Sequence, residues 1–497
     1  MKNIGLKIIG CLFAIQLIIL TLLRFRGNYH SFYINAYNYF LDNTYFKYDL
    51  FLNNSMLYDS TIYYKLLSFL GINVETDLVL FCIYLILIFI NLYFYSKIIQ
   101  QYYNPKNKWT VSLYIIPALV LGNFLAPNAE SALIYSHTGT ATQIAFTSIL
   151  LMIFFTLQHK WRLVFIFGCI SLLLASKHAA FPFLISITYF LVTQLGYRSV
   201  IKIYIACSIT IISFVHLYFS WMPKEHLLEN VEIIDFIILR NQHEDALYLQ
   251  SSRGILKLII GFACLFFSIK HLKNSNHKSY LSIVFYLSFI AVFFGGIYTS
   301  FLYLYYPEPY IVLLSTVKAM FLMQFFACAG ISKVIIESSL NTISKGIFIS
   351  VLFFGSFGGE TGENLAVVMM LIGFFIQIPI AQRLIIKLFS HFNFYYVERF
   401  KLYTPHDAKI LLVVLAITIP LTSNTLNNKL NSYSYYEGRY TIVNTSNQFL
   451  NEVTKLKDCQ DFKCCLRLFY YFIEKRFHHF TNFRYIHDLV HNLQDGG

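Results

Sequence analysis

Long runs of apolar residues alternate with short basic connections along most of the chain. The runs at residues 8–23, 78–95, 203–219 and 282–301 reach or approach the length of about 20 residues that an α-helix needs to cross a bilayer. We therefore expect an all-α fold, a polytopic bundle of transmembrane helices. The pattern predicts about thirteen spans, at approximate residues 6–24, 78–98, 110–127, 141–157, 163–176, 180–196, 202–221, 254–271, 279–304, 310–332, 345–358, 364–382 and 409–425.

The charges of the connections predict the orientation of these helices. With the N-terminus in the cytoplasm, every connection expected on that side carries lysine or arginine, as the positive-inside rule requires. These residues are Lys106 and Lys108, Lys160 and Arg162, Arg198 and Lys202, Lys270, Lys273 and Lys278, Lys333 and Lys345, and Arg383 and Lys387. The pattern predicts a multi-pass protein of the inner (plasma) membrane, with its functional groups on the outer face.

Two long outer loops and a polar tail complete the expected organisation. The loops are residues 25–77, with an amphipathic helix, and residues 222–253, and both belong to a transmembrane domain of residues 1–425. Residues 426–497 form a small soluble tail, which an odd number of crossings places outside. The apolar stretch at the N-terminus is too long for a signal peptide and lacks a small-residue cleavage site, so we interpret it as the first helix.

Composition supports a membrane protein and argues against a nucleic-acid partner. The 497 residues are 57% hydrophobic and 13% charged, whereas a soluble domain carries about 25% charged residues. The net charge is +13, but much of this excess falls in the expected cytoplasmic connections, and no basic, aromatic surface domain is evident. Tyrosines gather at the ends of apolar runs, as at Tyr93, Tyr95 and the Tyr305-Tyr306 pair, which is typical of an interfacial belt.

The first outer loop combines aromatic residues at helical spacing with three carboxylates. The aromatic residues predict a helix along the membrane surface, and they are Tyr29, Tyr33, Tyr37 and Phe40. The carboxylates are those of Asp42, Asp49 and Asp59. Near the outer interface a carboxylate can act as a general base toward a sugar hydroxyl, or hold a divalent cation that binds a diphosphate. The alternative is that each aspartate caps a helix or a turn.

Basic residues expected near the outer face are candidates for binding phosphate. Lys177 and His178 lie where two spans meet; they bind a lipid diphosphate or, alternatively, Lys177 only extends to the headgroups. The second loop offers Arg240, His243 and Arg253, and the planar fork of arginine fits phosphate well. For these three residues the alternative is a solvated helix face.

Lys318 is the one candidate within an expected span. It lies inside the apolar run 310–332, where an unpaired ammonium costs at least about 2.5 kcal/mol. It therefore needs a partner or a water-filled cavity. In the tail, His487 and His491 have no evident third ligand, so we predict no zinc site there.

This layout resembles that of the GT-C class of membrane glycosyltransferases. The resemblance is carried by the first helix, the long outer loop with its aspartates, the many further spans and the tail, and its best local matches are residues 29–67 and 142–190. In that class an aspartate of the first loop is the catalytic base, which implies this role for Asp42, Asp49 or Asp59. A basic residue of a late span reaches the donor cavity in several members, which implies a similar role for Lys318. The adjacent pair of carboxylates typical of the class is absent here.

The resemblance implies a membrane glycosyltransferase that moves a sugar from a polyprenyl-phosphate-linked donor to a glycan or lipid acceptor at the outer face, in surface polysaccharide or glycolipid assembly. The expected partners are this donor, the acceptor and the lipid bilayer, and a divalent metal ion is the one cofactor that the aspartates suggest. One alternative is an oligosaccharide repeat-unit polymerase for O-antigen or capsule, which depends on arginines of its outer loops. Another is a transporter or flippase, although no internal repeat is evident.

Overall fold

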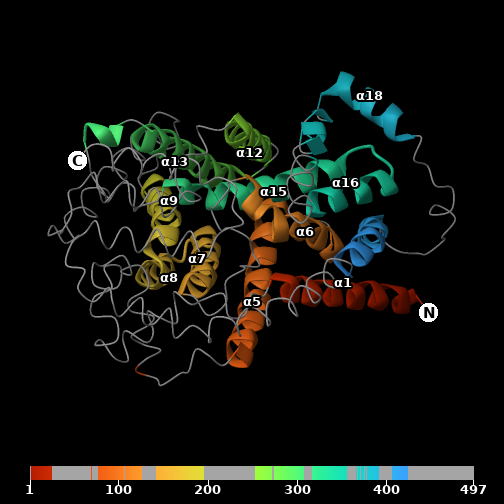
Figure 1. The fold of residues 1–497 in the computed structure, drawn as a ribbon, viewed down its shortest axis with the longest axis horizontal. Coiled ribbons are helices and arrows are strands. Elements are labelled where there is room, and N and C mark those ends of the chain that lie inside the picture. The colour runs from red at the N-terminus through yellow and green to blue at the C-terminus, as the bar shows by residue number, and fades with distance from the viewer. Residues whose placement is uncertain are drawn as a thin grey trace, which may run out of the picture. The chain divides into compact units, whose positions relative to one another are not determined.

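The computed structural model describes the chain in several stretches, with isolated positions between them (Figure 1). The stretches are residues 2–24, 77–105, 107–125, 141–194, 252–270, 274–300, 302–306, 316–354, 378–390 and 406–423. The chain divides into two compact units, Met1–Leu426 and Asn427–Gly497, and all of the described residues belong to the first.

Every regular element in these stretches is a helix, which confirms the expected all-α class for the part of the chain that the structure describes. The α-helices are α1 (Lys2–Arg24), α5 (Asp77–Tyr103), α6 (Lys108–Leu125), α7 (Ala141–Leu157), α8 (Trp161–Leu174), α9 (Ser176–Gln194), α12 (Ser252–Lys270), α13 (Ser275–Ser300), α15 (Met320–Glu337), α16 (Thr342–Phe354) and α18 (Pro379–Ser390). The 3₁₀-helices are η2 (Leu302–Leu304) and η3 (Thr316–Ala319). A further helix, His406–Ser423, carries no label.

Two helices have the length and apolar composition of membrane spans. They are Asn276–Tyr298, which is most of α13, and His406–Ser423. Several shorter apolar helices are also found in the described stretches: Lys7–Ile19, Thr142–Leu157, Trp161–Leu174, His178–Thr193, Leu258–Lys270 and Thr342–Phe353. The structure thus supports two candidate spans, and the larger number of crossings stays a prediction.

Helix α15 contacts many of the other helices, among them α6, α12, α13 and α16. Two tyrosines of α5 also reach it. The hydroxyl of Tyr95 donates a hydrogen bond to the carbonyl oxygen of Phe325 at 3.0 Å, and the hydroxyl of Tyr103 donates one to the carbonyl oxygen of Phe326 at 3.3 Å. Both tyrosines are buried. Because a buried hydroxyl is costly without a partner, these bonds favour one placement of α5 against α15.

Helices α7, α8 and α9 lie side by side (Figure 1). The turn between α7 and α8 is the basic connection expected at residues 159–162. The backbone N–H of His159 donates to the carbonyl of Thr156 at 3.1 Å, that of Lys160 donates to Phe155 at 3.0 Å, and His159 has a positive φ of 55°. This is the hydrogen-bond pattern of a Schellman motif, with histidine in the left-handed position that glycine usually takes.

Small residues allow the helices to approach closely, as is common between membrane helices. A Cβ atom on Gly168 of α8 would overlap the ring of Phe183 in α9, and one on Gly295 of α13 would overlap the side chain of Thr316 in η3. Neither contact leaves room for alanine without movement. These glycines therefore set the separation of α8 from α9 and of η3 from α13.

Two expected spans differ from the helices observed. The run expected as one helix over residues 310–332 contains η3 followed by α15, which begins at Met320. The run expected over residues 364–382 includes a bend at Ile378, and α18 begins at Pro379. Proline has no N–H and is favoured in the first turn of a helix, so it separates α18 from the residues before it.

Candidate functional site

Only part of the predicted site lies within the described residues. The residues outside them are Asp42, Asp49, Asp59, Arg240 and His243. Lys177 and Arg253 lie in the first turns of α9 and α12, and only their backbones are described. The structure therefore describes the side chains of two predicted residues, His178 and Lys318.

Lys318 is almost completely buried. Its side chain is 1% exposed, and it lies in η3, immediately before α15. The sequence predicted Lys318 within a continuous α-helical span. In the structure it lies in a short 3₁₀-helix instead. The hydroxyl of Ser288 in α13 donates a hydrogen bond to the carbonyl oxygen of Ala319 at 2.7 Å. That bond and the close approach of Gly295 to Thr316 hold η3 against α13.

His178 lies in the first turn of α9, where α8 and α9 meet as the sequence predicted. Its backbone N–H donates to the carbonyl of Ala175 at 3.2 Å, which starts the first turn. The half-buried imidazole ring packs against Phe146 of α7, with ring centroids 5.7 Å apart. Because η3 packs against α9, the structure brings the segment that carries Lys318 against the helix that begins with Lys177 and His178.

Three buried polar residues of α5 and α7 were not predicted as site residues. The hydroxyl of Thr147 donates a hydrogen bond to Oδ1 of Asn91 at 2.7 Å. Gln143 lies one turn before Thr147 and is 2% exposed, and its Nε2 has no hydrogen-bond partner among the described residues. A buried amide without a partner is uncommon and suggests a ligand or water nearby. The signal in the sequence was a polar residue within an apolar run.

This arrangement is suited to an anion. An ammonium in a low-dielectric interior interacts strongly with a negative group, and the N-terminus of α9 adds the positive end of a helix dipole. The amide of Gln143 is one helical turn from Phe146, the residue that contacts His178. No group of three or more His, Cys, Asp or Glu side chains that could hold a metal ion occurs in the described stretches.

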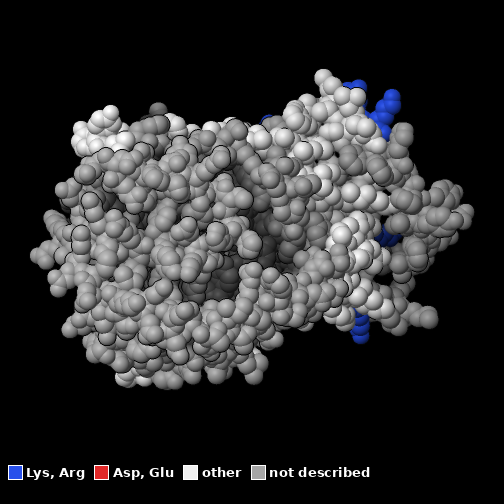
Figure 2. Space-filling view, in the orientation of Figure 1, with Lys and Arg blue, Asp and Glu red and all other residues white. Residues whose placement is uncertain are grey.

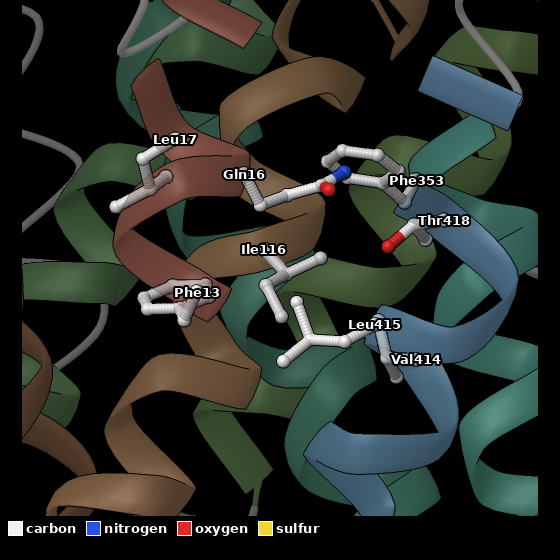
Figure 3. Close-up of a pocket in the computed structure, with 8 residues that line it drawn as sticks. All are labelled: Phe13, Gln16, Leu17, Ile116, Phe353, Val414, Leu415 and Thr418. Atoms are coloured by element: carbon white, nitrogen blue, oxygen red, sulfur yellow. The ribbon is translucent and has the colours of Figure 1, made fainter. Parts of the chain in front are cut away.

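A separate cavity lies between α1, α6, α16 and the helix His406–Ser423 (Figure 3). Its volume is about 10 Å³, which is room for about one water molecule and far too small for a sugar. Gln16 points its amide into this space, toward Phe353 and Thr418. The cavity is therefore a feature of helix packing.

Comparisons with known proteins identify no relative. No protein-family model, no curated protein and no solved structure matches the chain. We therefore base the proposed function on the residues of the chain itself.

Proposed function

We propose that the chain is a multi-pass glycosyltransferase of the inner (plasma) membrane, and that it transfers a sugar from a polyprenyl-phosphate-linked donor to a glycan or lipid acceptor at the outer face. The burial of Lys318 beside the helix that begins with Lys177 and His178 is the observation that carries the proposal. A buried cation is retained in such a place when it serves an anionic ligand, a proton pathway or a buried partner. The phosphate of a lipid-linked sugar is such a ligand.

Apolar surface on the described helices supports the multi-pass part of the proposal. In α13, Phe289, Phe293 and Phe294 are 48%, 49% and 62% exposed, and the rings of Phe289 and Phe293 stack in parallel, 6.0 Å apart. Helices α8 and α12 expose similar residues, including Ile166 and Ile259. Soluble monomers rarely expose large contiguous apolar patches, whereas helices in lipid do so along their outer faces.

The proposed reaction divides the work between two groups of residues. An aspartate of the first loop accepts the proton of the acceptor hydroxyl, and the resulting oxygen attacks the anomeric carbon of the donor. The bond from that carbon to the phosphate oxygen breaks, and the polyprenyl phosphate leaves with the negative charge. Lys318, with His178 and Lys177, stabilises this developing charge, which lowers the barrier because the positive groups are already in place.

The first experiment measures sugar transfer in membranes with polyprenyl-phosphate-linked donors. Lys318→Met should lower the rate on the order of 10²-fold, and Lys318→Arg should recover part of it. The matched control is Lys333→Met, because Lys333 lies near the end of α15 in a 3.8 Å ion pair with Glu337 and should leave transfer unchanged.

Substitution of Asp42, Asp49 and Asp59 by asparagine, one at a time, tests the base. One of the three changes should abolish transfer while the protein still inserts. Full activity in all three variants and in Lys318→Met would refute the proposal. Loss of activity in Arg240→Ala alone would favour the repeat-unit polymerase.

A transporter is the second candidate, and one observation favours it. Broken helices with irregular backbone near a binding site are typical of transporters, and Lys318 lies in a 3₁₀ segment, η3, immediately before α15. The same variants separate the two functions. If wild-type membranes transfer no sugar, but Lys318→Met abolishes uptake of a labelled lipid-linked sugar into vesicles, the transporter is the better assignment.

A further inference from the structure

Helix α18 is too short to cross a bilayer and is strongly amphipathic. Its 12 residues, Pro379–Ser390, extend about 18 Å at 1.5 Å per residue, whereas the hydrocarbon core is about 30 Å thick. The sequence predicted the end of a span, residues 364–382, followed by a basic cytoplasmic connection with Arg383 and Lys387. The structure shows a separate helix here (Figure 1).

One face of α18 is attached to the rest of the unit. Ile385 and Ile386 are partly buried and pack against the hydrophobic core. On the same side, Nε2 of Gln382 donates a hydrogen bond to Oγ of Ser339, at 3.2 Å, in the connection between α15 and α16. These contacts hold the helix at the end of the bundle where Lys333 and Lys345 are found, which is the cytoplasmic side in the predicted topology.

The other face exposes three large aliphatic side chains in a row. Ile380, Leu384 and Leu388 are 73%, 61% and 70% exposed. They follow one another at intervals of four residues, so they form a continuous stripe along the helix. Exposed aliphatic residues in this arrangement mark a surface that contacts lipid or another protein.

Two basic residues border this stripe. Arg383 and Lys387 are exposed and lie four residues apart, directly beside the aliphatic row on the helix surface. Figure 2 shows basic side chains projecting from the part of the surface that α18 forms. An aliphatic row beside a basic row is the pattern of helices that lie in a membrane interface, with the apolar side among the acyl chains and the basic side on the phosphates.

We propose that α18 binds the surface of the cytoplasmic leaflet and recognises anionic lipid headgroups through Arg383 and Lys387. Charge complementarity selects anionic lipid as the partner, because the exposed face carries two cations and no acid. Ile380, Leu384 and Leu388 insert beside the headgroups and fix the depth of the helix. The inference is independent of sugar transfer.

Photocrosslinking of the full-length protein in liposomes tests the position of the helix. A benzophenone amino acid at Leu384 should form adducts with lipid, which mass spectrometry identifies. The matched control places the same group at Ile386, on the packed face, where adducts should form within the protein. Equal lipid labelling at both positions, or protein adducts alone at Leu384, would overturn the proposal and would point to a protein partner in the second case.

Liposomes of phosphatidylcholine mixed with phosphatidylglycerol test the headgroup preference. Phosphatidylglycerol should be enriched among the adducts at Leu384 relative to the bulk lipid. The double substitution Arg383→Gln/Lys387→Gln should reduce this enrichment, by up to about fivefold for each charge removed. The charge-conserving variant Arg383→Lys/Lys387→Arg should retain it. Unchanged enrichment in the glutamine variant would refute a role for the two cations.

Discussion

Gln16 of α1 and Thr422 of the helix His406–Ser423 are 406 positions apart in sequence, yet Nε2 of Gln16 donates a hydrogen bond to Oγ1 of Thr422 at 2.8 Å. Thr422 in turn donates to the carbonyl oxygen of Thr418. The oxygen Oε1 of Gln16 has no hydrogen-bond partner in the described part of the chain. The first described helix is thus joined to the last by a hydrogen bond that uses only the NH₂ group of the Gln16 amide and not its carbonyl oxygen.

This contact predicts an asymmetric response to substitution. Thr422→Val leaves the buried amide of Gln16 without its acceptor and should lower the free energy of unfolding by about 1–3 kcal/mol. Gln16→Leu removes the whole polar group and should be nearly neutral or stabilising. The thermal midpoint in detergent measures both, and the double variant should resemble Gln16→Leu. An equal loss in the two single variants would contradict this account.

The packing of η3 on α13 predicts that Gly295 cannot be replaced freely. A Cβ atom at this position overlaps the side chain of Thr316, so Gly295→Ala should destabilise the protein by about 1–3 kcal/mol through overpacking. It should also reduce any activity that depends on Lys318, because η3 must move.

Gly10 in α1 is the matched control for this prediction. The nearest atom to a Cβ there belongs to Trp109, at 3.9 Å, so Gly10→Ala should be neutral or slightly stabilising, since alanine favours helix. Thr316→Gly should rescue Gly295→Ala in part. If Gly295→Ala is as stable as wild type, then η3 does not pack as described.

The helical class and the position of several helices could be predicted from the sequence, because apolar runs and basic connections are local signals. The turn at His159 and Lys160 and the meeting of α8 and α9 at Ala175 are examples, and both were expected from runs of residues on either side. Helix length was harder to predict. Residues 310–332 are apolar almost throughout, with Lys318 as the only charged residue. Hydropathy therefore does not show where the backbone changes from η3 to α15.

Contacts between distant residues could not be predicted in this way. Nothing local to Gln16 indicates that Thr422, 406 positions away, is its hydrogen-bond partner. Lys345 shows the same limit. It was expected in a cytoplasmic connection, at the start of the span 345–358, and the pattern gave no sign that only 5% of it is exposed. Its hydrogen-bond partner is the backbone carbonyl of Ile336 in the preceding helix. A contact with a backbone carbonyl cannot be predicted from the pattern of side chains.

We expect the hydroxyl of Tyr95 to contribute measurably to the stability of the contact between α5 and α15. Its bond to the carbonyl of Phe325 is 3.0 Å long and buried, so Tyr95→Phe should lower the free energy of unfolding by about 0.5–1.5 kcal/mol. Tyr305 is the control, because it is 77% exposed and Tyr305→Phe should have no effect. Chemical denaturation in mixed micelles compares the two. Equal stability of both variants would show that the Tyr95 bond is not important.

We expect a larger loss of stability from replacing Lys345 than from Tyr95→Phe, because Lys345 stabilises the end of a helix. Its Nζ donates a hydrogen bond to the carbonyl oxygen of Ile336 at 2.6 Å, and that carbonyl belongs to the last turn of α15, where no helical N–H is available. A cation at this end also interacts favourably with the helix dipole.

Lys345→Met keeps the length of the side chain and removes the donor, so it should lower the free energy of unfolding by about 1–3 kcal/mol. Lys333→Met, which removes the 3.8 Å ion pair to the exposed carboxylate of Glu337, should change it by less than about 1 kcal/mol. Hydrogen exchange then separates a local effect from a global one. In Lys345→Met, the amides in the last turn of α15 and at the start of α16 should exchange faster than in the Lys333→Met variant, whereas equal exchange in the two would mean that Lys345 does not stabilise this end of the helix.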